Sequence, residues 1–144
     1  MLKGIDPLIS PPLMNVLMNL GHGDEIVISD ANFPAASHAQ RLVHYNGHPL
    51  IDVLKGMLTL MPLDYAVDFS GILMAPPESM KSTPEIWADF AALFATQKNG
   101  DKPFLKLGKP EFYERARRAY AVVTTGEQRR FSNIILRMGV IATA

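Results

Sequence analysis

The sequence predicts an α/β fold built as a single domain over residues 1–144. Three observations support this prediction. Apolar spacings typical of helices alternate along the chain with short runs of β-forming residues. Neither an internal repeat nor a long linker interrupts that order. A chain of 144 residues that is 48% hydrophobic and 19% charged can bury one core, which excludes a disordered or low-complexity protein.

The first helix is expected to begin at Pro11, since proline suits the first helical position and Ser10 can cap it. Its apolar stripe has the spacing i, i+3, i+4 and i+7 and consists of Leu13, Val16, Leu17 and Leu20. Gly21 is the expected stop. The run Glu25–Asp30 contains three adjacent apolar β-formers, which predicts a strand covered on both faces and central in a sheet.

The elements expected in the middle of the chain are a loop over 31–35, a strand over 40–45, a turn at Asn46-Gly47, a helix over 50–60 and a strand over 72–75. The Asn-Gly pair is a strong turn signal. The helix is predicted from one apolar face that consists of Leu50, Val53, Leu54 and Met57. Two prolines, Pro76 and Pro77, end the strand.

The elements expected in the last part are a helix over 83–97, a strand over 104–107, a helix over 111–118, and strands over 120–125 and 133–138 joined by a polar loop over 126–132. Thr83 is the expected cap of the first of these helices and Pro84 its opening residue. Its buried face is expected to consist of Trp87, Phe90, Ala91 and Phe94. The charged helix has i, i+4 pairs at Glu111–Arg115 and Glu114–Arg118.

Charge and cysteine content exclude several classes of function. Fourteen basic and fourteen acidic residues leave no net charge, which argues against general nucleic-acid binding, since such binding depends on neutralising phosphates. The chain has no cysteine, so disulfides, thiol nucleophiles and cysteine-based metal sites are excluded. No apolar run has the length of a signal-peptide core or of a membrane span, and we expect a cytoplasmic protein.

The charges are unevenly distributed. Residues 1–72 hold three basic and seven acidic side chains, a balance of −4, whereas residues 73–144 hold eleven basic and seven acidic ones, a balance of +4. Chance and a solvated basic helix explain this asymmetry. The alternative is head-to-tail contact between copies, in which one half of the chain meets the other half of a neighbour.

His22 is the first candidate for chemistry. It lies between Gly21 and Gly23, after a helix and before the predicted central strand, and glycine on both sides leaves the imidazole uncrowded. The helix C-terminus and the nearby Asp24 and Glu25 favour the imidazolium, and a partly protonated histidine can donate a proton. The alternative is a histidine that caps the helix or fills a turn.

Asp30 ends the predicted central strand, and ligands of open α/β sheets bind beyond the carboxyl ends of strands. A carboxylate there can accept hydrogen bonds from ligand hydroxyls, although it can also bond its own backbone in the loop. Five later residues offer aromatic or polar contacts suited to a sugar, namely Lys109, Tyr113, Tyr120, Phe131 and Asn133. For these five, surface and core filling is the alternative.

Neither a metal nor a cofactor is expected. The remaining histidines are His38, His44 and His48, but a turn signal separates the last two and no His-Glu-x-x-His pattern occurs. The sequence contains no Gly-x-Ser-x-Gly elbow and no Gly-rich phosphate loop, so it offers no motif for a serine nucleophile or a nucleotide. The eight methionines are interpreted as core filling.

Six segments spread over nearly the whole chain form a further pattern. They are Pro7-Leu-Ile-Ser-Pro11, Leu20-Gly-His-Gly-Asp-Glu-Ile26, Ser29-Asp-Ala-Asn-Phe-Pro34, Glu111-Phe-Tyr-Glu-Arg-Ala116, Thr125-Gly-Glu127 and Asn133-Ile-Ile-Leu136. Together they resemble the L-fucose mutarotase and D-ribose pyranase family, and the late segments are closer to its fucose branch.

The resemblance implies a three-layer α/β/α domain around a mixed sheet and ring-shaped oligomers, often decamers of two stacked five-membered rings, with sites near subunit contacts. It implies conversion between the α and β anomers of a free sugar without a cofactor. Ribose members also interconvert pyranose and furanose rings. By the same resemblance His22 is the proton donor, Asp30 binds the sugar, and Lys109 and the segment Phe131-Ser132-Asn133 contact it.

Two residues depart from close fucose relatives, which have tyrosine at the position of Phe131 and arginine at that of Lys109. Loss of the phenolic hydroxyl removes one hydrogen bond, and lysine does not reproduce the planar fork of arginine. These departures concern the identity of the sugar more than the type of reaction.

We therefore expect a mutarotase that acts on a free aldose, with L-fucose first and ribose or galactose as alternatives. In this hypothesis protonated His22 serves the ring oxygen, while Asp30 orients hydroxyls or helps to receive the other proton. Two other classes of function are a non-catalytic sugar-binding protein associated with sugar uptake and a purely structural ring protein.

Overall fold

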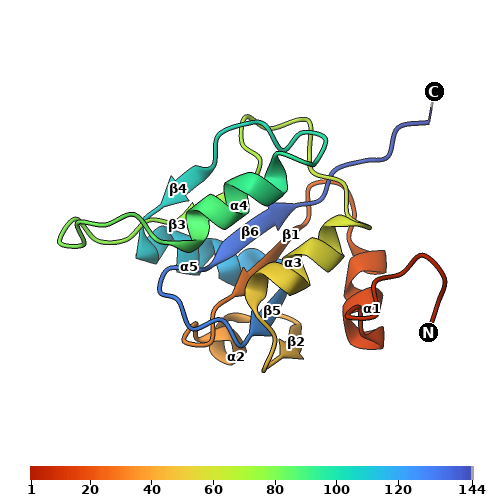
Figure 1. Cartoon of the computed structure of the whole chain (residues 1–144), viewed down its shortest axis with the longest axis horizontal. Helices are drawn as coiled ribbons and strands as arrows, with labels where there is room; N and C mark the ends of the chain where they lie inside the picture. Colours follow the sequence, from red (N-terminus) through yellow and green to blue (C-terminus); the bar gives the residue numbers. More distant parts are fainter. Residues whose placement is uncertain (144) are drawn as a thin grey trace.

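The computed structural model describes residues 1–143, and its helices and strands alternate along the chain as far as β5, which β6 follows directly (Figure 1). In order they are α1 (Pro11–Asn19), β1 (Glu25–Ser29), α2 (Ala35–His38), β2 (Leu42–Tyr45), α3 (Leu50–Leu58), β3 (Ile72–Met74), α4 (Ile86–Phe94), β4 (Leu105–Leu107), α5 (Lys109–Arg118), β5 (Ala121–Thr125) and β6 (Ile134–Arg137). The predicted α/β class is confirmed. Residue 144 of the expected domain lies outside the described residues.

The strands form one six-stranded mixed sheet with the order β2-β5-β1-β6-β3-β4. β1 pairs in parallel with β5, β5 with β2 and β3 with β4, while β6 runs antiparallel between β1 and β3. Every strand of this sheet except β6 therefore ends at the same edge, which we call the carboxyl edge. The opposite edge is called the amino edge, and the two edges hold different groups of candidate residues.

Helices cover both faces of the sheet, because alternate side chains of each strand point to opposite sides. Ile26 and Ile28 of β1 belong to a core that includes residues of α1, α3 and α4. Val27, between them, belongs to a second core that includes residues of α2 and α5. All three side chains are fully buried, so β1 is covered on both faces and central, as predicted.

The first helix follows its predicted signals. The Ser10 hydroxyl accepts a hydrogen bond from the Leu13 N–H at 3.3 Å, and Pro11 opens α1. The helix ends at Asn19, two residues before the predicted stop. The turn that follows contains Gly23 with a φ of 89°, a left-handed conformation that glycine adopts readily.

The fourth helix begins later than predicted, and Thr83 does not cap it. Residue Glu85 precedes α4 and is already helical, with no side-chain cap. The buried face consists of Ile86, Phe90 and Phe94, whereas the predicted Ala91 is exposed. The cause is the i, i+4, i+8 stripe that starts at Ile86, which packs on the sheet and fixes the rotation of the helix.

The ion pairs predicted within α5 are replaced by others. Arg115 donates two hydrogen bonds of 2.8 Å to Glu25 at the start of β1, and Glu114 pairs with Arg117 at 3.6 Å. A bidentate pair with a carboxylate that is 11% exposed is stronger than an exposed pair along one helix. The predicted loop over 31–35 also leads into α2, a helical turn that the sequence pattern did not predict.

Candidate functional site

A cavity of about 610 Å³ opens at the carboxyl edge, where β1, β3 and β4 end and β6 begins. It brings together five of the residues predicted for a site: Asp30, Lys109, Tyr113, Phe131 and Asn133. Apolar residues form much of the remaining wall of the cavity: Phe33, Met74, Ala75, Pro76 and Pro77. The volume is within the range of small-molecule sites, and a polar side opposite an apolar side can orient a ligand.

Asp30 lies at the end of β1 and is 5% exposed. Its Oδ1 accepts a hydrogen bond from the Asn32 N–H at 3.0 Å, and its Oδ2 accepts one from the Ser132 N–H at 3.4 Å. Its own N–H donates to Oδ1 of Asn133 at 2.9 Å. Burial raises the pKa of the Asp30 carboxyl, although these hydrogen bonds oppose the rise. Ser132 is thus placed behind Asp30 and holds it.

Lys109 and Tyr113 approach the cavity from the first two turns of α5. The Lys109 ammonium lies 5.4 Å from the centre of the Tyr113 ring. The same ring packs edge-on against Phe33 and His38, with centroid distances of 5.2 and 5.0 Å. Phe131 enters from the β5–β6 connection with a φ of 55°, a left-handed conformation that is uncommon for an aromatic residue.

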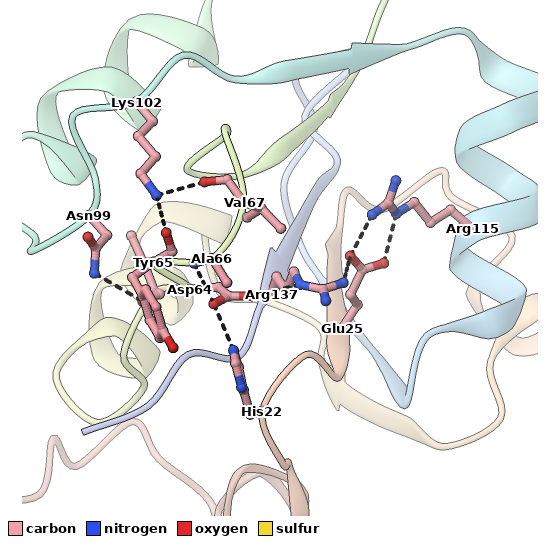
Figure 2. A network of polar contacts seen from close by, with 11 residues as sticks. His22, Glu25, Asp64, Tyr65, Ala66, Val67, Asn99, Lys102, Arg115 and Arg137 are labelled. Atoms are coloured by element: carbon pink, nitrogen blue, oxygen red, sulfur yellow. Dashed lines mark hydrogen bonds and ion pairs between the residues drawn. The ribbon is translucent and has the colours of Figure 1, made fainter. Parts of the chain in front are cut away.

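His22 lies at the amino edge, in the turn before β1, and not beside Asp30. Its Nε2 is 2.9 Å from Oδ1 of Asp64, and its ring stacks on Tyr65 with centroids 5.9 Å apart (Figure 2). The carboxylates expected next to it have other partners: Asp24 accepts from the Gly21 N–H, and Glu25 binds Arg115. The His22 side chain is 41% exposed, so Nδ1 remains the ring nitrogen available to a ligand.

Asp64 connects His22 to a chain of charges (Figure 2). Its Oδ2 accepts from Nε of Arg137 at 2.7 Å, and Arg137 also lies 3.6 Å from Glu25. The Asp64 side chain is 1% exposed. Burial raises its pKa, but hydrogen bonds from the Ala66 N–H, His22 and Arg137 outweigh burial and lower the pKa to about 2. Asp64 therefore stays ionised and orients the imidazole.

The irregular segment 63–67 presents Asp64 and Tyr65 to His22. Lys102 holds this segment by donating hydrogen bonds to the carbonyls of Tyr65 and Val67, at 2.9 and 2.7 Å. Leu63 also forms a β-bridge with Met138, just after β6. Sequence reasoning missed Asp64 because the residues after it show no periodic pattern and it lies 42 positions from His22. No local signal in the sequence points to this contact.

Tyr120 is likewise at the amino edge, directly before β5. The Arg41 guanidinium lies 3.9 Å from the centre of its ring, and both residues line a polar hollow with Arg118 and Arg137. His22 and Tyr120 are thus separated from Asp30 by the length of β1. A five-residue strand covers about 16 Å, so one copy of the chain does not bring all predicted site residues together.

Within residues 1–143, no three histidine, cysteine, aspartate or glutamate side chains are placed to hold a metal ion. His38 is on α2, His44 on β2 and His48 in the loop before α3. Over the same residues, no helix has the length and apolar character needed to cross a membrane.

Replacing Asp64 with asparagine is expected to remove part of the acid sensitivity of folding. The folded pKa is lowered to about 2 from 3.8, so the ionised carboxylate stabilises the fold above pH 3.8 and this contribution is lost as the pH falls towards 2. The shift corresponds to about 2 kcal/mol. Urea unfolding between pH 7 and pH 2 measures it. Asp68→Asn, an exposed acid in the same part of the chain, is the control, and identical pH dependence of Asp64→Asn and the wild type would contradict the assignment.

The fold and cavity are those of a small α/β domain with a partly polar cavity at the carboxyl edge of a mixed sheet, the place where open α/β sheets commonly hold ligands. Residues 3–141 match the RbsD / FucU transport protein family, and the chain belongs to this family. The predicted family is thereby confirmed.

Solved structures show the same relationship. The fucose mutarotase of Streptococcus pneumoniae, in complex with L-fucose, is 40% identical to this chain. The match covers 98% of this chain and 100% of the mutarotase chain, with a TM-score of 0.91. FucU of Bifidobacterium longum is 38% identical, with coverage of 97% and 100% and a TM-score of 0.92. RbsD of Bacillus subtilis, complexed with D-ribose, is 27% identical, with coverage of 99% and 100% and a TM-score of 0.76. These similarities agree with the predicted fucose branch.

Proposed function

We propose that this chain is a sugar mutarotase that interconverts the α and β anomers of a free aldose, with L-fucose as its preferred substrate. The observation that carries the proposal is the carboxyl-edge cavity, which unites Asp30, Lys109 and Asn133 opposite an apolar wall. Similarity to a fucose mutarotase with L-fucose and to RbsD with D-ribose supports it. The reaction opens a hemiacetal and closes it on the other face, so one proton donor and one acceptor suffice.

L-Fucose fits the two sides of the cavity. Its hydroxyls can donate to the Asp30 carboxylate and bond the Asn133 amide. Its ring also carries a methyl group, which Met74, Pro76 and the neighbouring apolar side chains can cover. D-Ribose offers no such methyl group. The higher identity to the fucose mutarotase than to RbsD points in the same direction.

We further propose that a complete site forms between two copies. His22 and Tyr120 lie at the amino edge and Asp30 at the carboxyl edge, so a neighbour has to supply the first pair. Head-to-tail contact between neighbouring copies would bring these two edges together. A closed ring of such contacts, doubled into a decamer, is the proposed assembly.

In this site His22 would exchange a proton with the ring oxygen through Nδ1. Asp64, bound to Nε2 at 2.9 Å, fixes the ring and stabilises the imidazolium when it forms. Asp30 would accept hydrogen bonds from sugar hydroxyls and help to receive the proton of the anomeric hydroxyl. The mechanism needs no redox step, since ring opening and closing conserve the oxidation state.

The second candidate function is sugar binding without catalysis, in connection with sugar uptake. The description of the matched family as transport proteins favours it. Such a protein would depend on Asp30 and Asn133 but not on His22.

Nuclear magnetic resonance of anomer exchange tests the proposed function. L-Fucose, D-ribose and D-galactose are each observed with and without the protein, and saturation of the α-anomeric proton reduces the β signal only where exchange is fast. We expect enhanced exchange that is largest for L-fucose. Saturable binding without enhancement for any of the sugars would contradict catalysis and favour the binding function.

The methyl-covering wall leads to a prediction about specificity. D-Arabinopyranose shares the ring hydroxyl arrangement of L-fucose and lacks its methyl group. Burial of one such group is worth about 0.8 kcal/mol, so KM for D-arabinose is expected to be about fourfold higher. L-Galactose, which carries a hydroxymethyl group there, should be no better because its hydroxyl meets apolar side chains. Initial exchange rates at several sugar concentrations give the KM values, and equal values for the three sugars would contradict the role of the wall.

A further inference from the structure

The β5–β6 loop, residues 126–133, supplies Phe131 and Asn133 to the cavity, whereas Arg129 in the same loop lies outside the cavity lining. Arg129 binds two carboxylates on different elements. Its Nε is 3.0 Å from Oε1 of Glu127 within the loop, and one terminal nitrogen is 2.8 Å from Oδ2 of Asp89 on α4. These contacts tie the loop to a helix that packs on the sheet.

Glu127 is the buried partner of Arg129 in these contacts. Its side chain is 8% exposed and accepts hydrogen bonds from both the side chain and the N–H of Arg129. Burial alone would raise the pKa of the Glu127 carboxyl, but Arg129 and the N–H of Leu50 at the start of α3 outweigh burial and lower it. The Glu127 carbonyl also accepts from the Ala31 N–H at 2.8 Å, directly after Asp30.

The part of the loop beyond Arg129 is strained and coupled to Asp30. Phe131 has a φ of 55°, a left-handed conformation that a residue other than glycine keeps only where its surroundings enforce it. The Ser132 hydroxyl donates to the Arg129 carbonyl at 2.8 Å, while the Ser132 N–H faces Asp30 at 3.4 Å. Asn133 accepts from the Asp30 N–H at 2.9 Å. The position of Arg129 therefore influences the groups that face the ligand.

We propose that Arg129 is a positioning residue: by joining Glu127 to Asp89 it holds the β5–β6 loop so that Phe131 and Asn133 face the sugar beside Asp30. The sugar-binding part of this inference rests on the proposed function. Arg129 lies outside the cavity lining, and its ion-pair partners are Glu127 and Asp89 and not the amino-edge pair of His22 and Asp64. Its loss should weaken sugar binding and leave proton transfer largely intact, which is a rise in KM with little change in kcat.

Three variants test the proposal. Arg129→Met removes the contacts with both Glu127 and Asp89. Asp89→Asn removes only the negative charge that faces Arg129 from α4. Arg129→Lys retains the positive charge at position 129. We expect KM for L-fucose to rise about tenfold in Arg129→Met and about threefold in Asp89→Asn, since small misplacements of binding groups have effects of this order. Arg129→Lys should lie between the wild type and Arg129→Met. Arg117→Ala, which removes an exposed pair with Glu114, is the matched control and should match the wild type.

Amide hydrogen exchange of residues 130–133 gives a readout that does not depend on catalysis. It should be faster in Arg129→Met and Asp89→Asn than in the wild type and the control. Asp89→Asn leaves Glu127 paired, so it tests the connection even if Arg129→Met folds poorly. If the wild type binds no sugar, the proposed function fails, and amide exchange still decides whether Arg129 holds the loop. Unchanged KM and unchanged exchange in both Arg129→Met and Asp89→Asn would overturn the proposal.

Discussion

Replacing His22 with glutamine is expected to slow anomer exchange by about 10²- to 10⁴-fold, the usual contribution of general acid–base catalysis. Glutamine can still donate a hydrogen bond to Asp64, so the turn before β1 should keep its structure. It cannot carry a proton to and from the sugar. Sugar binding should remain, since the variant leaves Asp30, Lys109 and Asn133 of the cavity unchanged.

Saturation-transfer measurements with L-fucose give the exchange rate, and calorimetric titration gives sugar affinity for the same preparations. His44→Gln is the matched control, because His44 is an exposed histidine on β2 that lines neither the carboxyl-edge cavity nor the polar hollow at the amino edge. Asp64→Asn should lose less activity than His22→Gln, since it leaves the imidazole in place and removes only the charge behind it. Full activity of His22→Gln would refute the proposed mechanism.

The sequence patterns predicted the strands of the sheet more reliably than the ends of the helices that connect them. The central strand was predicted correctly because three adjacent apolar residues require burial on both faces. The predicted start of α4 was wrong. Thr83 and Pro84 carry a helix-start signal, but the packing of Ile86 overrides it. Tertiary packing decides such helix ends, and a local pattern does not contain it.

For the candidate site, local patterns likewise identified single residues but not their contact partners. His22 and Asp30 stood out because each adjoins a predicted strand. Their separation by that strand was also contained in the sequence, since one precedes β1 and the other follows it. The Asp64 contact was not, because it depends on how an irregular segment folds back over the sheet edge. The cavity wall at Met74 likewise depends on the strand order, which places β3 two strands from β1.

The separation of His22 from Asp30 leads to the second large expected effect. Asp30→Asn removes the carboxylate that we propose binds sugar hydroxyls and should reduce activity about 10- to 100-fold, the value of one hydrogen bond to a charged group. His22→Gln loses activity for a different reason, since it removes the proposed proton donor. If each site takes His22 from one copy and Asp30 from its neighbour, a mixture of the two variants rebuilds intact sites. Random assembly of equal amounts should give intact pairs at about one quarter of the interfaces.

Co-expression of the two variants with different tags, followed by sequential purification on both tags, yields the mixed oligomers for this test. Their anomer-exchange activity should approach one quarter of the wild-type value, above the about 1–10% expected of Asp30→Asn alone and the about 1% or less expected of His22→Gln alone. Mass spectrometry of the intact assemblies confirms that both variants are present. The double variant His22→Gln/Asp30→Asn mixed with wild-type chain is the control, because it shows how activity falls when defects share one copy. Mixed oligomers without recovered activity would mean that sites do not combine these edges, and the geometry of β1 would then leave His22 without a role at the sugar.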